Sequence, residues 1–296
     1  MQQLVSIIIP TYKGSDKICN AVDSVLNQTY ENIEIIVVDD NGKGTDEQKL
    51  TELKMNKYSG NKKVKYLTHE VNINGSAARN TGIRASKGEF LGFLDDDDVF
   101  LPEKTEKEVR LFNSLDKSYG LVYGSFVEHM NENYSRTLLA DNTEDFLFRY
   151  LCNEIIACSS TAMIRRNVLE KVVEWDESFK RHQDLEFFAR VASNYKVACV
   201  KDLCIEKFKL DRNMPKGKTY EEYRMYFLDK MSPIIQSFSP KKQNYLYNIH
   251  YTEIGKCYLK EKDIKSALKW AKKTSNFPKA LFVFLIDGLK YFSRNH

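Results

Sequence analysis

Short apolar runs alternate with longer amphipathic segments through most of the chain. The apolar runs have the length of strands, and the segments between them place apolar residues at helical spacing. We expect strands at Leu4–Pro10, Ile33–Val38, Val64–Leu67, Phe90–Leu94, Leu121–Val127, Ser159–Ile164 and Lys196–Val200. We expect helices near Asp16–Asn27, Asp46–Met55, Ser76–Ala85, Glu103–Leu111 and Gln183–Ser193. This alternation is typical of βαβ units and predicts an α/β fold with a mostly parallel sheet.

The pattern changes after the segment Lys209–Lys218, which contains Pro and Gly and has no periodicity. Such a segment predicts a linker or a mobile loop. The residues beyond it follow a helical pattern. Small and aromatic residues there match the spacing of one tetratricopeptide-like hairpin: Tyr251, Ile254, Gly255, Tyr258, Ala267 and Ala271. We therefore expect an α/β domain over residues 1–215 and a helical C-terminal region over residues 216–296.

The last predicted helix, Phe277–Phe292, is apolar and is preceded by several lysines. Three interpretations fit this pattern: peripheral contact with a membrane surface, packing in a homodimer, or burial against the other C-terminal helices.

The composition fits a soluble globular protein. Of the 296 residues, 42% are hydrophobic and 29% are charged, and the net charge of +4 gives little support to nucleic-acid binding. The six cysteines form no C-x-x-C pair, which favours reduced thiols and the cytoplasm. The N-terminus lacks the features of a secretion signal, and no apolar run reaches the roughly 20 residues that span a bilayer. We expect a cytoplasmic protein, either free or peripheral to the inner face of the membrane.

Four consecutive aspartates, Asp95 to Asp98, follow the apolar run Phe90–Leu94 directly. Carboxylates at the carboxyl end of a buried strand lie where open α/β sheets bind ligands, and adjacent like charges there favour a bound cation. The hard oxygen ligands suit Mn²⁺ or Mg²⁺. A solvated acidic turn is the alternative interpretation.

A second acidic pair, Asp39-Asp40, ends the strand Ile33–Val38 and precedes Asn41-Gly42. A carboxylate at this edge of the sheet can accept hydrogen bonds from a nucleobase or from ribose hydroxyls. A turn aspartate before Asn-Gly is the alternative.

Four motifs together resemble the inverting family 2 glycosyltransferases, which have the GT-A fold. They are Val5-Ser6-Ile7-Ile8-Ile9-Pro10-Thr11-Tyr12, Val37-Val38-Asp39-Asp40, Ala78-Arg79-Asn80-Thr81-Gly82 and Phe93-Leu94-Asp95-Asp96-Asp97-Asp98. The resemblance covers about the first 200 residues and leaves out the helical tail from about Thr219. It implies a nucleotide-diphosphate sugar donor, usually a UDP-sugar, and a Rossmann-like GT-A sheet.

The resemblance also implies roles for individual residues at the donor site. Pro10, Thr11 and Tyr12 line the base, Asp40 contacts uracil, and Arg79 holds the nucleotide. Asp95, Asp96 and Asp97 form the D-x-D element, in which Asp97 and Asp95 are the expected metal ligands and Asp96 supports the donor. We expect Asp98 to cap the helix that follows.

An inverting transfer needs a general base, and the resemblance assigns this role to Asp184. The family commonly has an acidic pair here, whereas this chain has Gln183-Asp184. A structural acid in the first helical turn is the alternative, and Glu186 is the fallback base. Trp175 and His182 are weaker candidates for acceptor binding, with a buried aromatic and a polar surface residue as the alternatives.

The sequence therefore predicts a metal-dependent glycosyltransferase that modifies a hydroxyl of a glycan or lipid-linked glycan, in surface polysaccharide synthesis. One alternative is a nucleotide-sugar-binding subunit that is catalytically idle. Another is a nucleotidyltransferase, for which Thr11-Tyr12-Lys13-Gly14 is a poor phosphate loop.

Overall fold

The computed structural model describes residues 2–208, 215–275 and 277–278. Its chain divides into two compact units, the first comprising residues 1–150 and 155–210 and the second residues 151–154 and 211–296. The predicted division at residues 215 and 216 stays a prediction. The α/β class with a mostly parallel GT-A-like sheet and C-terminal helices is confirmed.

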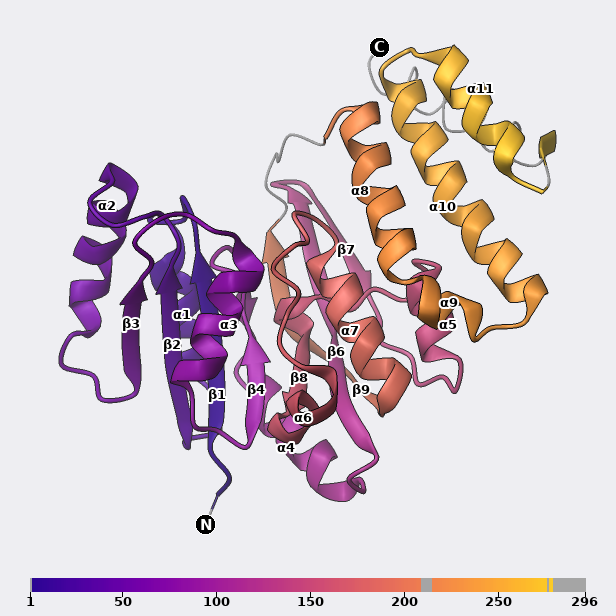
Figure 1. The fold of residues 1–296 in the computed structure, drawn as a ribbon. Coiled ribbons are helices and arrows are strands. Elements are labelled where there is room, and N and C mark those ends of the chain that lie inside the picture. Colours follow the sequence, from indigo (N-terminus) through magenta and orange to yellow (C-terminus); the bar gives the residue numbers. More distant parts are fainter. Residues whose placement is uncertain (1, 209–214, 276, 279–296) are drawn as a thin grey trace. The chain divides into compact units, whose positions relative to one another are not determined.

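One twisted sheet forms the centre of the first unit (Figure 1). Its strands are β1 (Val5–Thr11), β2 (Ile33–Asp39), β3 (Val64–Thr68), β4 (Phe90–Phe93), β5 (Val99–Phe100), β6 (Tyr119–Asn131), β7 (Tyr134–Leu138), β8 (Ala162–Arg165) and β9 (Lys196–Phe208). The strand order is β3-β2-β1-β4-β8-β6-β9-β5, and β7 pairs with β6. The block β3-β2-β1-β4 is parallel, and β8 joins it antiparallel to β4.

Helices connect these strands. They are α1 (Ile18–Leu26), α2 (Asp46–Met55), α3 (Gly75–Ala85), α4 (Lys104–Ser114), α5 (Phe146–Leu151), α6 (Leu169–Val172) and α7 (Gln183–Asn194). Helix α2 begins after Thr45, whose hydroxyl accepts a hydrogen bond from Gln48 N, and α3 begins after Asn74, whose side chain accepts from Ala77 N. Thr45 and Asn74 are therefore the N-cap residues of these two helices.

Successive side chains of each strand point to opposite faces of the sheet, and both faces are covered by helices. On one face, Val5, Ile7 and Ile9 of β1 pack in one core with residues of α1 and α4. On the other face, Ile8 packs in a second core with α3 and α7, which lie in front of the sheet in Figure 1. The continuous apolar strands of the sequence are explained by this double cover.

The predicted elements are present, with two informative differences. The expected strand Ser159–Ile164 starts as a 3₁₀ turn, Ser159–Thr161, and only then becomes β8. The expected strand Lys196–Val200 continues to Phe208 as β9, which pairs with β6 along its length through register shifts. Both differences affect residues near the aspartate run.

The second unit is helical. It contains α8 (Gly217–Lys230), α9 (Ser232–Gln236), α10 (Pro240–Lys260) and α11 (Ile264–Lys273). Gly255 of α10 is buried, as is Ala267 of α11, and Trp270 Nε1 donates a 2.9 Å hydrogen bond to Glu221. The tetratricopeptide-like assignment stays a prediction.

The predicted helix over Phe277–Phe292 lies outside the described residues, apart from residues 277 and 278. Dimer or membrane contact through it stays a prediction. Among the helices that the structure describes, none combines the length and the apolar character needed to cross a membrane.

Candidate functional site

The carboxyl ends of β1, β2 and β4 meet at one edge of the sheet, where the predicted donor residues gather. Pro10 and Thr11 end β1, and Tyr12 follows with half of its surface exposed. Asp39 ends β2, and Asp95 comes two residues after the end of β4. Parallel strands bring these sequence-distant residues together at the edge where α/β sheets bind ligands.

Asp95 is held by two basic side chains and two serines. Arg79 Nη2 lies 2.7 Å from Asp95 Oδ1, and Lys207 Nζ lies 4.0 Å from Oδ2. Ser159 Oγ donates to Asp95 Oδ1 at 2.8 Å, and Asp95 N donates to Ser160 Oγ at 3.1 Å. Burial alone would raise the pKa of Asp95, but Arg79, Lys207 and the Ser159 bond lower it to about 2. Asp95 is therefore ionised at neutral pH.

Asp96 turns toward β1. Its Oδ2 accepts a 2.6 Å hydrogen bond from Thr11 Oγ1 and a longer one, 3.3 Å, from Tyr12 N. A Cβ on Gly14 would lie 2.0 Å from the same oxygen, so only glycine leaves room for this contact. Burial raises the pKa of Asp96 to about 6. Asp96 thus fixes the turn that is expected to line the base.

Asp98 corrects the prediction that it caps the following helix. Helix α4 starts at Lys104, and its N-cap residue, Glu103, makes no side-chain capping bond. Asp98 is buried instead, accepts a 2.5 Å hydrogen bond from Ser160 Oγ and pairs with Lys207. The short strand Val99–Phe100 follows directly and pairs with β9, so Asp98 is drawn toward Lys207 rather than toward the helix.

Lys207 is the residue that the sequence prediction missed. It lies near the end of β9, and its ammonium group pairs with Asp98 and faces Asp95. Burial lowers the pKa of Lys207, but the acidic groups around it, among them Asp98 and Asp95, outweigh that effect and raise it well above its usual range. The lysine is therefore a fixed positive charge beside the aspartates.

Asp40 is almost fully buried under the loop that follows β3. Its Oδ1 lies 2.7 Å from His69 Nδ1 and accepts from Ile73 N at 3.0 Å, while Oδ2 accepts from Asn72 Nδ2 at 2.8 Å. A carboxylate has about four acceptor positions, so these bonds leave capacity for one more donor. That capacity is compatible with the expected uracil contact. Neighbouring Asp39 accepts hydrogen bonds from Asn41 N and from the Tyr66 hydroxyl.

Asp184 lies in the first turn of α7, and the backbone of Ser159 is close enough to its carboxylate to lower its pKa. Burial raises the pKa of Asp184, Arg79 opposes the shift and Asp95 adds to it. The charges of Arg79 and Asp95 are therefore near enough to influence it. A carboxylate whose pKa is raised toward neutrality is suited to proton abstraction.

The residues around Asp184 have separate partners. Gln183 Oε1 accepts a 3.2 Å hydrogen bond from Arg79 Nη1, and Glu186, the fallback base, forms a salt bridge with Arg190. Trp175 is 2% exposed and stacks on Phe187, with the Arg79 guanidinium 4.8 Å above its ring. The indole therefore supports Arg79 in this conformation. His182 is partly exposed at the N-cap of α7, with φ of 62°.

Three carboxylates have the composition of a divalent metal site. Asp95, Asp97 and Asp98 each offer one oxygen, and these oxygens lie within 4.8 Å of one another. Hard oxygen donors at this spacing fit Mn²⁺ or Mg²⁺. Asp95 and Asp97, the expected ligands, are both in this group, and Asp98 joins them.

The chain matches a known protein family. The family model described as glycosyl transferase family 2 matches residues 6–173, more than half of the chain. The chain belongs to this family, and the predicted resemblance is confirmed.

Curated relatives include glycosyltransferases of polysaccharide synthesis. The amylovoran biosynthesis glycosyltransferase AmsB of Erwinia amylovora is 29% identical over 246 residues, covering 77% of each chain. The Escherichia coli enzyme WfgD, named as a UDP-Glc:alpha-D-GlcNAc-diphosphoundecaprenol beta-1,3-glucosyltransferase, is 35% identical over 130 residues, covering 44% of this chain and 48% of its own. The matches to uncharacterised glycosyltransferases of three Rickettsia species span 19%, 28% and 60% of those relatives' lengths.

Solved structures with the same fold include two glycosyltransferases. Residues 1–349 of Staphylococcus aureus TarS, in complex with UDP-GlcNAc, give a TM-score of 0.59 at 16% identity, covering 89% of each chain. The mannosyltransferase PcManGT from Pyrobaculum calidifontis, in complex with GDP-Man and Mn²⁺, gives 0.60 at 16% identity, covering 98% of this chain and 81% of its own. At this identity the likeness establishes the fold alone.

Proposed function

We propose that this protein transfers a sugar from a nucleoside diphosphate donor, a UDP-sugar, to a hydroxyl of a glycan or lipid-linked glycan, with inversion at the anomeric carbon. The observation that carries the proposal is the junction of Arg79, Asp95 and Lys207 at the carboxyl edge of the sheet, in a chain of glycosyl transferase family 2. Surface polysaccharide synthesis is the proposed context, because AmsB is named for amylovoran biosynthesis and WfgD for a transfer to a lipid-linked sugar.

The donor half of the site combines a base-binding edge with a charged diphosphate edge. Tyr12 offers an exposed aromatic face, and Asp40 has acceptor capacity for a base N–H. Arg79 and Lys207 bring positive charge to the expected diphosphate position. Structures of two relatives by fold hold UDP-GlcNAc or GDP-Man, which supports a nucleotide-sugar donor for this chain.

Asp95, Asp97 and Asp98 would hold Mn²⁺ or Mg²⁺, with Asp97 as the principal ligand. When bound, the ion supplies Lewis-acid stabilisation of the negative charge on the departing diphosphate. The protein's own contribution there is to fix the ligands, through Ser159 on Asp95 and Ser160 on Asp98. Arg79 and Lys207 add fixed charges that favour the same developing charge.

Asp184 is the proposed general base. Its carboxylate removes the proton from the acceptor hydroxyl as that oxygen attacks the anomeric carbon on the side opposite the departing diphosphate. Burial raises its pKa, which increases its basicity while leaving it ionised above that pKa. The turn that contains Ser159 thus holds Asp95 through the Ser159 hydroxyl and lies close enough to Asp184 to influence its pKa.

A donor screen followed by a transfer assay tests this proposal. Thermal stability would be measured with UDP-sugars and GDP-mannose, with and without Mn²⁺, because a ligand that binds the native state raises the melting temperature. The stabilising donor would then be incubated with lipid-linked glycan acceptors while release of the nucleoside diphosphate is followed. Metal-dependent release with a glycosylated product is expected. Selective donor binding without turnover on any acceptor would favour the catalytically idle binding subunit instead.

The proposal also includes the bound ion and the location of the protein. The ion is Mn²⁺ or Mg²⁺, and the location is cytoplasmic, either free or peripheral to the membrane.

A further inference from the structure

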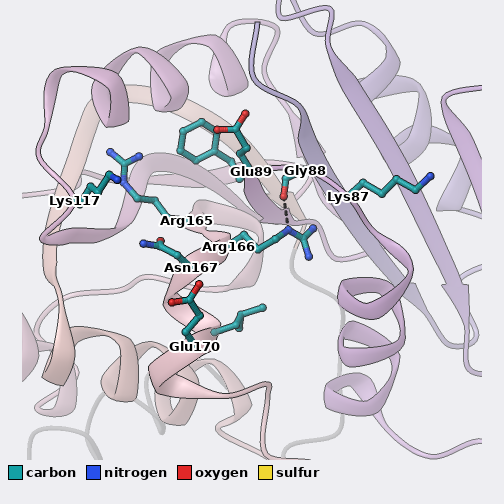
Figure 2. A pocket seen from close by; sticks show the side chains of 10 residues that line it. Lys87, Gly88, Glu89, Lys117, Arg165, Arg166, Asn167 and Glu170 are labelled. Atoms are coloured by element: carbon teal, nitrogen blue, oxygen red, sulfur yellow. Dashed lines mark hydrogen bonds between the residues drawn. The ribbon is translucent and has the colours of Figure 1, made fainter.

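A pocket of about 630 Å³ lies at the amino-terminal end of β4, at the other end of that strand from the aspartate run (Figure 2). The guanidinium groups of Arg165 and Arg166 point to opposite sides of it, and both donate to backbone oxygens. Each arginine also has an acidic neighbour, Asp116 for Arg165 and Glu34 for Arg166. The positive charge of the pocket is therefore compensated within the protein, and we assign no ligand to it.

At the donor edge, His69 connects the carboxylate of Asp40 with helix α3. His69 Nδ1 lies 2.7 Å from Asp40 Oδ1, and His69 Nε2 lies 2.9 Å from Thr81 Oγ1. The side chains of His69 and Asp40 are only 10% and 4% exposed. Both ring nitrogens thus have a partner, and the imidazole is held between the residue that follows β2 and a hydroxyl of α3.

The groups around Asp40 make its carboxylate a hydrogen-bond acceptor. Ile73 N donates to Oδ1 at 3.0 Å, and Asn72 Nδ2 donates to Oδ2 at 2.8 Å. Because both groups only donate, Asp40 accepts at both oxygens, and His69 Nδ1 carries the proton of its bond to Asp40. The Thr81 hydroxyl can donate to Nε2 or accept from it, so His69 donates to Asp40 in its neutral and in its cationic form.

A carboxylate that only accepts distinguishes the two pyrimidine bases. Uracil has an N–H at ring position 3, whereas cytosine has a nitrogen lone pair at the same position. The N–H of uracil can donate to the acceptor position that remains on Asp40. The lone pair of cytosine would face the carboxylate and leave both groups without a hydrogen bond, which is costly at a buried site.

We propose that His69 is the positioning residue that gives the donor site its preference for uracil over cytosine. The inference rests on the proposed function, because it takes Asp40 as the contact of the base in a nucleoside diphosphate sugar. His69 fixes Asp40 Oδ1, and Thr81 fixes the ring of His69, so the remaining acceptor position of Asp40 has a set direction. Without the imidazole, the carboxylate loses a donor and the orientation that this donor imposes.

Calorimetric titration with UDP and with CDP, both in the presence of Mn²⁺, tests the proposal. The wild-type protein should bind UDP about tenfold or more tightly than CDP. His69→Leu removes both hydrogen bonds of the ring and should reduce this preference about tenfold, mainly through weaker UDP binding. His69→Asn keeps an amide N–H near the position of Nδ1 and should retain most of the preference.

Tyr66→Phe is the matched control. It removes the 2.6 Å hydrogen bond from the Tyr66 hydroxyl to Asp39, the carboxylate next to Asp40, and should leave the preference unchanged. Titration with Mn²⁺ alone checks that each variant keeps its fold, because the aspartate run follows another strand. If His69→Leu fails this check, Thr81→Val takes its place, with an expected loss of preference of about threefold.

Several outcomes would overturn the role of His69. They are an unchanged preference in His69→Leu, equal weakening of UDP and CDP, the same loss of preference in Tyr66→Phe, or a wild-type protein that binds both nucleotides equally. If His69→Leu does not fold, an unchanged preference in Thr81→Val overturns it. A wild-type protein that binds no nucleotide at all would instead contradict the proposed function itself.

Discussion

Arg79 Nη2 lies 2.7 Å from Asp95 Oδ1, and this ion pair joins helix α3 to the aspartate run. The same guanidinium donates to Gln183 Oε1 and to Ser159 Oγ and lies over the ring of Trp175. One side chain thus connects the proposed donor edge with the segment that carries the proposed base.

Arg79→Met should therefore affect both stability and donor binding. The variant leaves the partly buried Asp95 carboxylate with the more distant Lys207 as its basic partner, and we expect a loss of about 3 kcal/mol in the free energy of unfolding. Urea denaturation followed by circular dichroism measures this. Arg84→Met, in the same helix, breaks a more exposed pair with Glu174 and should cost less than about 1 kcal/mol. Equal losses in the two variants would contradict the central place of Arg79.

Gly14→Ala should disturb the turn that is expected to line the base. The new Cβ would lie 2.0 Å from Asp96 Oδ2 and 2.6 Å from its Cγ, so Asp96 must leave Thr11. We expect a loss of about 2 kcal/mol in stability and weaker nucleotide binding, measured by urea denaturation and calorimetry. Gly60→Ala introduces a Cβ with no atom within 4 Å and should change stability by less than about 0.5 kcal/mol. A Gly14→Ala variant as stable as Gly60→Ala would contradict the close contact.

The aspartates of the run should have different roles, with Asp97 in metal binding and Asp96 at the turn that is expected to line the base. Asp97→Asn is expected to weaken Mn²⁺ binding strongly, because it removes a charged ligand from the group that also contains Asp95 and Asp98. Asp96→Asn should leave Mn²⁺ binding nearly unchanged, since Asp96 turns toward Thr11. Calorimetric titration with Mn²⁺ in the absence of nucleotide compares them. Stronger impairment by Asp96→Asn would reverse the assignment.

His250 should make the helical unit sensitive to acid. Its ring is fully buried, with Nδ1 3.2 Å from Arg224 Nη1, and burial followed by the Arg224 charge lowers its pKa from 6.5 to about 3. At pH values between about 3 and 6.5, His250 is therefore protonated in the unfolded state and neutral in the folded state. Stability is fully present above about pH 6.5 and falls as the pH decreases, by about 1.4 kcal/mol per pH unit.

The matched variant for this prediction is His250→Gln, whose amide can still donate to Leu151 O as His250 Nε2 does at 2.9 Å. Urea denaturation between pH 7 and pH 4 should show a slope that is smaller in the variant by about one proton. Identical slopes in the two proteins would show that His250 does not titrate on unfolding.

Much of the fold could be predicted from the sequence because strong apolar runs and helical periodicity agree along the first unit. Helix α2 was predicted at its observed bounds, Asp46–Met55. The continuation of β9 was missed because exposed residues at 201–203 interrupt its apolar pattern. Pairing with β6 carries the strand past that interruption through register shifts, which no local pattern records.

The site was predictable in its motifs and not in its ion pairs. Asp40 and Asp95 follow the carboxyl ends of β2 and β4, on either side of β1, as expected from the parallel topology, and Arg79 of α3 reaches Asp95. Lys207 was missed because it is far from the aspartates in sequence and in a segment not expected to be a strand. The resulting pair with Asp98 explains why that residue is buried and not a helix cap. One signal was present: Lys207 lies between the apolar residues 203–205 and Phe208.

The most direct test of the account compares Asp184→Asn with the wild-type protein, using the donor and acceptor found by the screen. The amide is nearly isosteric but cannot accept the proton, so donor and metal binding should be unchanged by calorimetry while the transfer rate falls about 10²–10⁴-fold. Asp176→Asn, in the preceding loop, should transfer sugar at the wild-type rate. Wild-type turnover by Asp184→Asn, or a product that retains the donor's anomeric configuration by proton NMR, would contradict an inverting transfer with Asp184 as its base.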